Sequence, residues 1–143
     1  MSNNFTPLSA NELVKRINNI PKVELANLPT PLEFLPNISK ELEINLFIKR
    51  DDCTGLAFGG NKTRHLEFIM HKAKIGDYDC VLTGAATQSN WCRQTVAAAN
   101  KLGLDTFLVL VRGVKSNHMQ GNFLLYDILG AQVDVVEGEN LED

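Results

Sequence analysis

The sequence has no excess of basic residues. Its 143 residues include 14 Lys and Arg against 17 Asp and Glu, which gives a formal net charge of -3. Proteins that bind nucleic acid through its phosphates need clustered Lys and Arg to displace counterions, whereas the basic residues here are scattered along the chain. The composition therefore argues against a nucleic-acid-binding surface, and we expect no nucleic-acid partner.

Paired cysteines and long apolar runs are missing as well. The three cysteines, Cys53, Cys80 and Cys92, are an odd number without C-x-x-C spacing, so neither a disulfide framework nor a zinc site is indicated. No apolar run approaches the ~18 residues that span a bilayer, and the first residues lack the basic and apolar regions of a signal peptide. We therefore expect a cytoplasmic protein with reduced thiols, no membrane contact and no metal site.

What the sequence does contain is enough apolar material, 44% of its residues, for one compact domain. Residues 1–44 are predicted to form an N-terminal arm with short helices. The first of these helices begins at Ser9 and Glu12, which have the spacing of a capping box, and the second lies near residues 37–43. Residues 45–143 are predicted to form the main domain.

In the main domain, a helical apolar stretch, a glycine and a β-branched apolar run recur three times. Gly76, Gly103 and Gly130 are evenly spaced, each where a helix would end in a left-handed residue. A repeat of this size is typical of βαβ units, and a run such as residues 107–111 suits a strand that is covered on both faces. The repeats share little beyond the glycine, which argues against a solenoid. We predict an α/β fold, an open parallel sheet of βαβ units with helices on both faces, and strands near residues 45–49, 80–83, 106–111 and 132–136.

This fold places two polar loops at one edge of the predicted sheet. In open parallel sheets, ligands bind beyond the carboxyl ends of the strands. Residues 50–61 follow the first predicted strand, and residues 84–89 follow the second. We therefore expect the loop at 55–63 to face residues 87–90 across this edge.

The loop GLAFGGNKT at residues 55–63 is one residue longer than the G-x-x-x-x-G-K-T motif of P-loop NTPases. The additional Asn61 displaces Lys62 by one position, which on a helix is a rotation of about 100°. The run at 107–111 is followed by Arg112 rather than by the Asp that a metal-binding strand would supply. These departures disfavour an NTPase.

Lys62 and Arg64 lie in the predicted first turn of a helix, where the helix dipole disfavours cations. Such a placement is explained by a nearby anion, or by an amine that is kept neutral and therefore nucleophilic. The alternative is an ordinary solvated lysine at the surface.

Several segments of the chain, in order, carry a recognisable pattern. They are LPTPLEFLP (28–36), IKRDD (48–52), GLAFGGNKTR (55–64), LEF (66–68) and QSN (88–90), the last followed by Arg93 and Gln94. With these segments the chain resembles the D-cysteine desulfhydrase and 1-aminocyclopropane-1-carboxylate deaminase family. Members of that family are pyridoxal-phosphate enzymes of the tryptophan-synthase-β fold type.

The resemblance implies a site for pyridoxal 5'-phosphate and for a small amino-acid substrate. Lys62 would hold the cofactor as a Schiff base and would then take or return the substrate's Cα proton. Asn90 would hydrogen-bond the 3-hydroxyl group of the cofactor. Ser89 would contact the substrate carboxylate or act as a nucleophile or proton relay, and the backbone N–H groups of Asn90 and Trp91, at a helix N-terminus, suit the same carboxylate. Ser89 is equally a residue type that caps a helix.

The resemblance implies one of two reactions. One converts D-cysteine to pyruvate, hydrogen sulfide and ammonia, and the other converts 1-aminocyclopropane-1-carboxylate to 2-oxobutanoate and ammonia. The segment QGNFLLYDILG at 120–130 favours the D-cysteine branch. His65 and Trp91 stand where the family commonly has other residues, and this leaves the substrate open.

Members of the family are much longer than this chain. A glycine-rich loop for the cofactor phosphate, a partner for the pyridine nitrogen and the family's active-site tyrosines are not evident in the sequence. We therefore interpret the chain as the N-terminal portion of such an enzyme, inactive by itself, with a C-terminal cofactor-phosphate domain absent. Its expected partner is a separately encoded C-terminal half or a second copy in a homodimer. The alternative is a non-catalytic α/β module.

Overall fold

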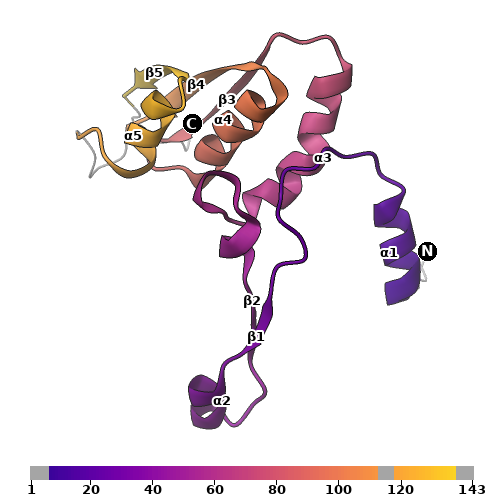
Figure 1. The fold of residues 1–143 in the computed structure, drawn as a ribbon. Helices are drawn as coiled ribbons and strands as arrows, with labels where there is room; N and C mark the ends of the chain where they lie inside the picture. The colour runs from indigo at the N-terminus through magenta and orange to yellow at the C-terminus, as the bar shows by residue number, and fades with distance from the viewer. Residues whose placement is uncertain (1–6, 113–117, 138–143) are drawn as a thin grey trace, which may run out of the picture.

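The computed structural model describes residues 7–112 and 118–137, and Figure 1 shows how they are arranged. None of the described helices is long and apolar enough to cross a membrane. In chain order the elements are α1 (Ala10–Asn18), β1 (Leu32–Phe34), α2 (Pro36–Leu42), β2 (Phe47–Lys49), the 3-10 helices η1 (Asp51–Thr54) and η2 (Leu56–Phe58), α3 (Lys62–Ile75), β3 (Cys80–Ala86), α4 (Asn90–Leu102), β4 (Asp105–Val111), α5 (Gly121–Ile128) and β5 (Gln132–Val136).

The main sheet has three parallel strands in the order β3-β4-β5. Helix α4 connects β3 to β4, and α5 precedes β5, so the chain follows the βαβ pattern that the apolar runs predicted. The α/β class and the parallel strand order are confirmed.

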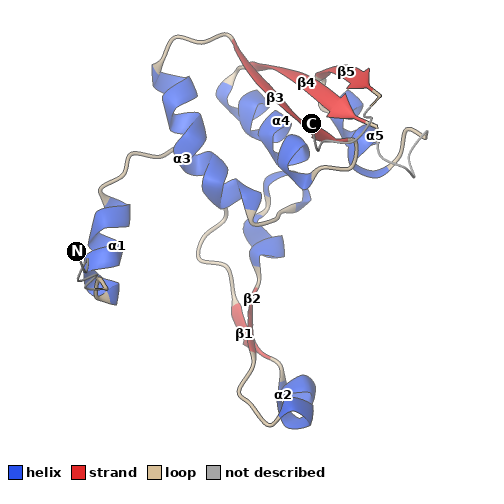
Figure 2. Cartoon of the chain, turned by 180° about the vertical axis from the view of Figure 1, so that it is seen from behind, coloured by secondary structure: helices blue, strands red, loops and turns tan. Residues whose placement is uncertain are grey.

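Strand β2 does not join this sheet, and the prediction that residues 45–49 begin it is wrong. Instead, β2 pairs antiparallel with β1, with Leu32 opposite Lys49 and Phe34 opposite Phe47. All six residues of the two strands are exposed. Figure 2 shows this hairpin and α2 extending away from the main sheet, with α1 separate on another side. A strand with both faces exposed has no burial pattern that identifies its partner, because pairing is specified by the buried face.

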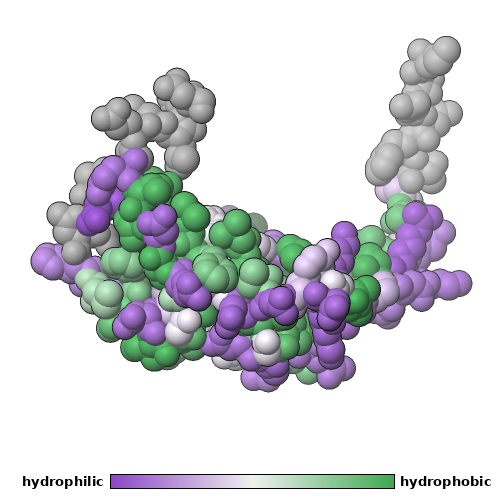
Figure 3. Space-filling view, turned by 90° about the horizontal axis from the view of Figure 1, so that it is seen from above, coloured by the Kyte–Doolittle hydropathy of each residue, from purple (hydrophilic) through white to green (hydrophobic). Residues whose placement is uncertain are grey.

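Helices cover one face of the main sheet in the described part of the chain. Leu108 and Leu110 of β4 are buried in one cluster with residues of both α4 and α5. The alternate residues Phe107 and Val109 are 36% and 41% exposed, and Leu82 on β3 is 70% exposed. Figure 3 shows hydrophobic residues gathered over the end of the molecule that holds this sheet. The expectation of helices on both faces is therefore corrected: among the described residues, α4 and α5 lie together on one face.

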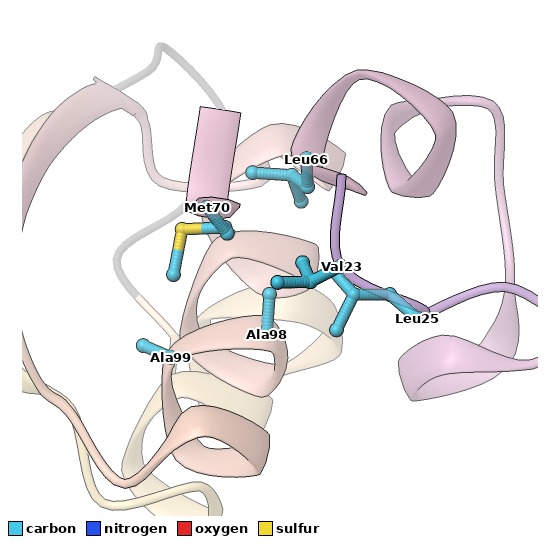
Figure 4. Close-up of a cluster of buried hydrophobic side chains, with 6 residues drawn as sticks. All are labelled: Val23, Leu25, Leu66, Met70, Ala98 and Ala99. Carbon is cyan, nitrogen blue, oxygen red and sulfur yellow. The ribbon is translucent and has the colours of Figure 1, made fainter. Parts of the chain in front are cut away.

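A second core cluster joins α3 to α4 and to the segment that follows α1. Leu66 and Met70, one helical turn apart on α3, contact Ala98 and Ala99 of α4, and Val23 and Leu25 complete the cluster (Figure 4). All of these side chains are buried. The small alanines leave room for the larger residues of α3, so the two helices pack directly against each other.

Two of the three repeated glycines have the predicted left-handed conformation. Gly103 ends α4 with φ 75°, and Gly130 follows α5 with φ 78°. The prediction for Gly76 is wrong, because its φ is -96° and the following Asp77 takes the left-handed conformation with φ 53°. The chain makes one further turn there before β3 begins.

The capping box at the start of α1 is confirmed. The Ser9 hydroxyl accepts a hydrogen bond from the Glu12 backbone N–H at 3.3 Å, and the Glu12 carboxylate accepts one from the Ser9 N–H at 3.2 Å. No residue of α1 is buried. The helix therefore forms on local signals, without a tertiary core of its own in the described part of the chain.

Candidate functional site

The loop that ends at Lys62 requires glycine at two consecutive positions. Gly59 has φ 73°, and a Cβ atom there would overlap the carbonyl oxygen of Asp52. Gly60 has φ 132°, and a Cβ atom there would lie 2.5 Å from the Gln94 Nε2 atom. Side chains at these positions would be both strained and obstructed. The loop therefore has a fixed, close-packed path, and it delivers Lys62 as the first residue of α3, where its side chain is partly exposed.

Buried hydrogen bonds hold this loop against α4. The Thr54 hydroxyl accepts from the Gly60 N–H at 2.9 Å, which closes the loop on itself. The Gln94 Oε1 atom accepts from the Thr63 N–H at 2.8 Å and from the Thr63 hydroxyl at 2.7 Å. Thr54, Thr63 and Gln94 are fully buried. Since buried polar groups without partners are costly, these bonds specify one position of the loop on α4.

The charge of Arg64 is engaged in an ion pair with Asp51. Its guanidinium donates to both oxygens of Asp51, at 2.7 and 2.9 Å, and to the Thr30 hydroxyl at 2.9 Å. The hydrogen bond from Arg64 lowers the pKa of Asp51. Arg64 therefore ties the start of α3 to η1 and to the chain before β1. This bonded arrangement accounts for a cation in the first turn without a bound anion.

The turn between β3 and α4 carries the other predicted site residues. The Ser89 hydroxyl accepts from the Cys92 N–H at 3.3 Å, so its predicted role as a helix cap is confirmed. The Tyr126 hydroxyl donates to the Ser89 carbonyl oxygen at 2.8 Å, and burial raises the pKa of Tyr126 well above its usual range. A neutral tyrosine from α5 thus holds this turn in place.

Trp91 was expected beside the substrate, but its side chain packs against the core. Its indole Nε1–H donates to the Thr83 hydroxyl on β3 at 3.0 Å, and the ring packs against both core clusters. The side chain therefore packs into the core. Only the backbone N–H of Trp91, in the first turn of α4, remains suited to an anionic ligand.

Arg93 connects three segments that are distant in sequence, and sequence reasoning gave it no role. Its guanidinium donates to the Gly59 carbonyl oxygen at 2.9 Å, to Asn90 Oδ1 at 3.0 Å and to Asn122 Oδ1 at 2.8 Å. The loop before Lys62 and the start of α4 therefore meet, as predicted, and the start of α5 meets them. Arg93 was noted in the sequence only as a residue that follows the QSN segment at 88–90. No sequence pattern indicated its contact with Asn122.

A family model for "Pyridoxal-phosphate dependent enzyme" matches residues 23–143, a range that contains the whole site described above. The chain belongs to the pyridoxal-phosphate-dependent enzyme family. The assignment agrees with the resemblance seen in the sequence segments.

Relatives of this chain include proteins with two different names. The chain is 45% identical over 120 residues to a Pyrococcus horikoshii protein provisionally named a 1-aminocyclopropane-1-carboxylate deaminase, covering 84% of this chain and 36% of that protein. It is 42% identical over 128 residues to a D-cysteine desulfhydrase of Klebsiella pneumoniae, covering 87% of this chain and 39% of that protein. The chain thus spans about two fifths of the length of these relatives.

A solved structure supports the same family assignment. The crystal structure of an ACC deaminase homologue matches with a TM-score of 0.83 and 39% sequence identity, covering 92% of this chain and 40% of that chain. A fungal L-serine ammonia-lyase from Rhizomucor miehei matches with a TM-score of 0.56 at 24% identity, which is a likeness of fold alone. The fold of this chain is that of the corresponding part of the ACC deaminase homologue.

Proposed function

We propose that this chain is the N-terminal portion of a pyridoxal-phosphate-dependent lyase or deaminase that acts on a small amino acid. The two candidate substrates are D-cysteine, converted to pyruvate, hydrogen sulfide and ammonia, and 1-aminocyclopropane-1-carboxylate, converted to 2-oxobutanoate and ammonia. The observation that carries the proposal is the fixed attachment of the Lys62 loop to the start of α4, where Ser89 and Asn90 lie. The first residue of α3, Lys62, is thereby brought near the helix N-terminus that carries Ser89 and Asn90.

The residues at this edge fit the cofactor chemically. The backbone at Gly59 and Gly60 packs directly against Asp52 and Gln94, which fixes the position of Lys62 at the start of α3. Lys62 would hold the cofactor through its amine, and Asn90 would hydrogen-bond the ring oxygen. When bound, pyridoxal phosphate supplies an electron sink for the substrate.

The remaining roles fall to groups of this chain around the substrate. With D-cysteine as the substrate, Lys62 would take the proton from Cα, whereas 1-aminocyclopropane-1-carboxylate has no proton at that carbon. The N–H groups in the first turn of α4, beside Ser89, would bind the substrate carboxylate, because the positive end of the helix dipole favours an anion there. The Ser89 hydroxyl is a further candidate for a nucleophile or proton relay, since it lies at the same turn.

A second candidate function is a non-catalytic α/β module. Such a module would bind the cofactor weakly or not at all. Under the enzyme proposal, turnover would use further segments, supplied by a separately encoded half or by a second copy in a homodimer.

The experiment that separates these proposals is a covalent trap on the full chain. The protein is mixed with pyridoxal phosphate and reduced with borohydride, and its peptides are examined by mass spectrometry. We expect a cofactor adduct on Lys62 in the wild-type chain and none at that position in Lys62→Ala. The matched control is Lys74→Ala, which changes an exposed lysine in the last turn of the same helix and should keep the adduct. Equal labelling of scattered lysines in all three proteins would favour the non-catalytic module.

A further inference from the structure

Arg93 lies at the centre of the site and acts there only as a hydrogen-bond donor. It donates to Gly59, Asn90 and Asn122, while its Nε atom is buried without a hydrogen-bond partner. A guanidinium has only donors and no acceptor. Every group that it contacts must therefore present an oxygen, and this constraint applies to the two asparagine amides as well.

The amide of Asn122 is oriented by bonds on both of its ends. Its Oδ1 accepts from Arg93 at 2.8 Å. Its Nδ2 donates to the Gln88 carbonyl oxygen at 2.8 Å and to Asn90 Oδ1 at 3.0 Å. An exchanged orientation would place an NH2 group against the guanidinium and an oxygen against the Gln88 carbonyl oxygen, so only one orientation satisfies all the partners.

The amide of Asn90 is thereby oriented in turn. Its Oδ1 accepts from both Arg93 and Asn122, each at 3.0 Å. The Nδ2 lies on the other side of the planar amide, and no described residue accepts a hydrogen bond from it. Asn90 itself is exposed. The side chain therefore offers a free donor at the edge of the sheet, and its acceptor is fully used within the protein.

We propose that Arg93 and Asn122 are positioning residues that orient the Asn90 amide so that it donates a hydrogen bond to an anionic oxygen of the ligand. The inference rests on the proposed function, in which that oxygen belongs to the ring of pyridoxal phosphate. Arg93 also bonds the Gly59 carbonyl oxygen, so the same side chain fixes the loop that leads to Lys62. Lysine would replace the planar fork with a single ammonium and could not hold all these oxygens with the same geometry.

The first test needs no cofactor. In the 15N-labelled full chain, NMR measures the exchange of side-chain amide protons with water. We expect the Asn90 NH2 protons to exchange several-fold faster than those of Asn122, which are bonded to two oxygens and serve as the internal control. Added pyridoxal phosphate should slow the Asn90 protons selectively. If the Asn90 protons are as protected as those of Asn122 in the cofactor-free chain, the proposed orientation is wrong.

The second test measures cofactor affinity in a double-mutant cycle. Asn90→Asp keeps an acceptor for Arg93 but removes the donor, and we expect pyridoxal phosphate to bind roughly tenfold to a hundredfold more weakly, as for the loss of a hydrogen bond to a charged group. Arg93→Met should weaken binding more when Asn90 is present than in an Asn90→Ala background, where only its bonds to Gly59 and Asn122 are lost. Arg93→Lys, a milder change, covers the case in which Arg93→Met fails to fold.

The outcomes separate this inference from the proposed function. If the wild-type chain forms no adduct on Lys62, the proposed function fails, and the cofactor-free NMR comparison still decides the orientation of Asn90. If the adduct forms but Arg93→Met weakens binding equally with and without the Asn90 amide, Arg93 acts on the fold in general, and only the positioning role is overturned.

Discussion

Helices α1 and α4 both begin with a serine cap, but they differ in how many of their residues are buried. Each is capped by a serine hydroxyl, from Ser9 in α1 and from Ser89 in α4. No residue of α1 is buried, whereas a continuous run of α4, residues 94–99, is buried. The difference shows that capping determines where a helix starts, while tertiary packing determines how much it contributes to the stability of the fold.

The N-terminal arm is joined to the main domain through the segment at 22–27. Val23 and Leu25 are part of the core cluster. Glu67 of α3 bonds the same segment: its carboxylate accepts from the Lys22 ammonium at 2.8 Å and from the backbone N–H groups of Leu25 and Ala26. The segment is therefore anchored by apolar contacts and by one buried carboxylate. Apolar residues of α1 and the hairpin, by contrast, are exposed.

The largest expected contrast comes from removing a leucine from each region. Leu66→Ala would leave a cavity between α3 and α4, and we expect it to lower the free energy of unfolding by about 2–5 kcal/mol. Leu13→Ala, on the exposed face of α1, is expected to change it by about 0.5 kcal/mol or less. Urea titrations followed by circular dichroism measure both changes. Equal losses in the two variants would mean that α1 packs on the main domain as tightly as α3 does.

A smaller contrast is expected at the two glutamates that bond backbone N–H groups. Glu67→Gln removes the charge from a buried carboxylate, and we expect a loss of about 1–3 kcal/mol at neutral pH, because hydrogen bonds to charged groups are stronger than neutral ones. The matched change, Glu12→Gln in the exposed capping box, keeps an acceptor in the same place and should have little effect on global unfolding. The free energy of unfolding at pH 7 tests both.

The effect at Glu67 should depend on pH. Burial alone would raise the pKa of this carboxyl, but the hydrogen bonds from Lys22, Ala26 and Leu25 outweigh burial and lower the pKa below the ordinary value of 4.5. A lowered pKa in the folded state stabilises the fold above the unfolded-state value and loses that contribution as the pH falls through the folded value. The urea midpoints of wild type and Glu67→Gln should therefore converge as the pH drops below about 4.5. A constant difference down to acidic pH would contradict the assigned bonding of Glu67.

Local patterns were sufficient for the three strands and two helices of the main sheet. The apolar run at 107–111 and the glycines after α4 and α5 indicated parallel strands with crossover helices. A buried strand needs consecutive apolar residues, and a helix often ends at a left-handed glycine. The edge rule for parallel sheets applies to the turn at Ser89 and Asn90, which follows β3. The loop before Lys62 follows β2, which lies outside the main sheet, and meets this turn through long-range hydrogen bonds. The hydrogen bonds from Thr63 to Gln94 join the start of α3 to α4.

The features that sequence reasoning missed depend on partners far away in the chain. The pairing of β2 with β1 could not be read from residues 47–49, whose exposed side chains have no periodic pattern. Arg93 bonds Gly59 and Asn122, which lie 34 and 29 positions away, so its role is visible only once the loops are assembled. The inward packing of Trp91 similarly depends on the Thr83 hydroxyl on a neighbouring strand.

The smallest contrast is expected at the two helix caps, and it tests most directly whether capping or tertiary packing determines the contribution of a helix to stability. Ser89→Ala removes the acceptor for the Cys92 N–H, and we expect a loss of about 1 kcal/mol in global stability, since α4 unfolds with the core. Ser9→Ala should leave global stability unchanged and only accelerate hydrogen exchange of the backbone amides in α1, because that helix can fray without exposing buried side chains. Hydrogen exchange measured by mass spectrometry on both variants distinguishes local from global effects. If Ser9→Ala instead lowers the urea midpoint as much as Ser89→Ala does, α1 unfolds together with the core, and its lack of buried residues does not make it independent.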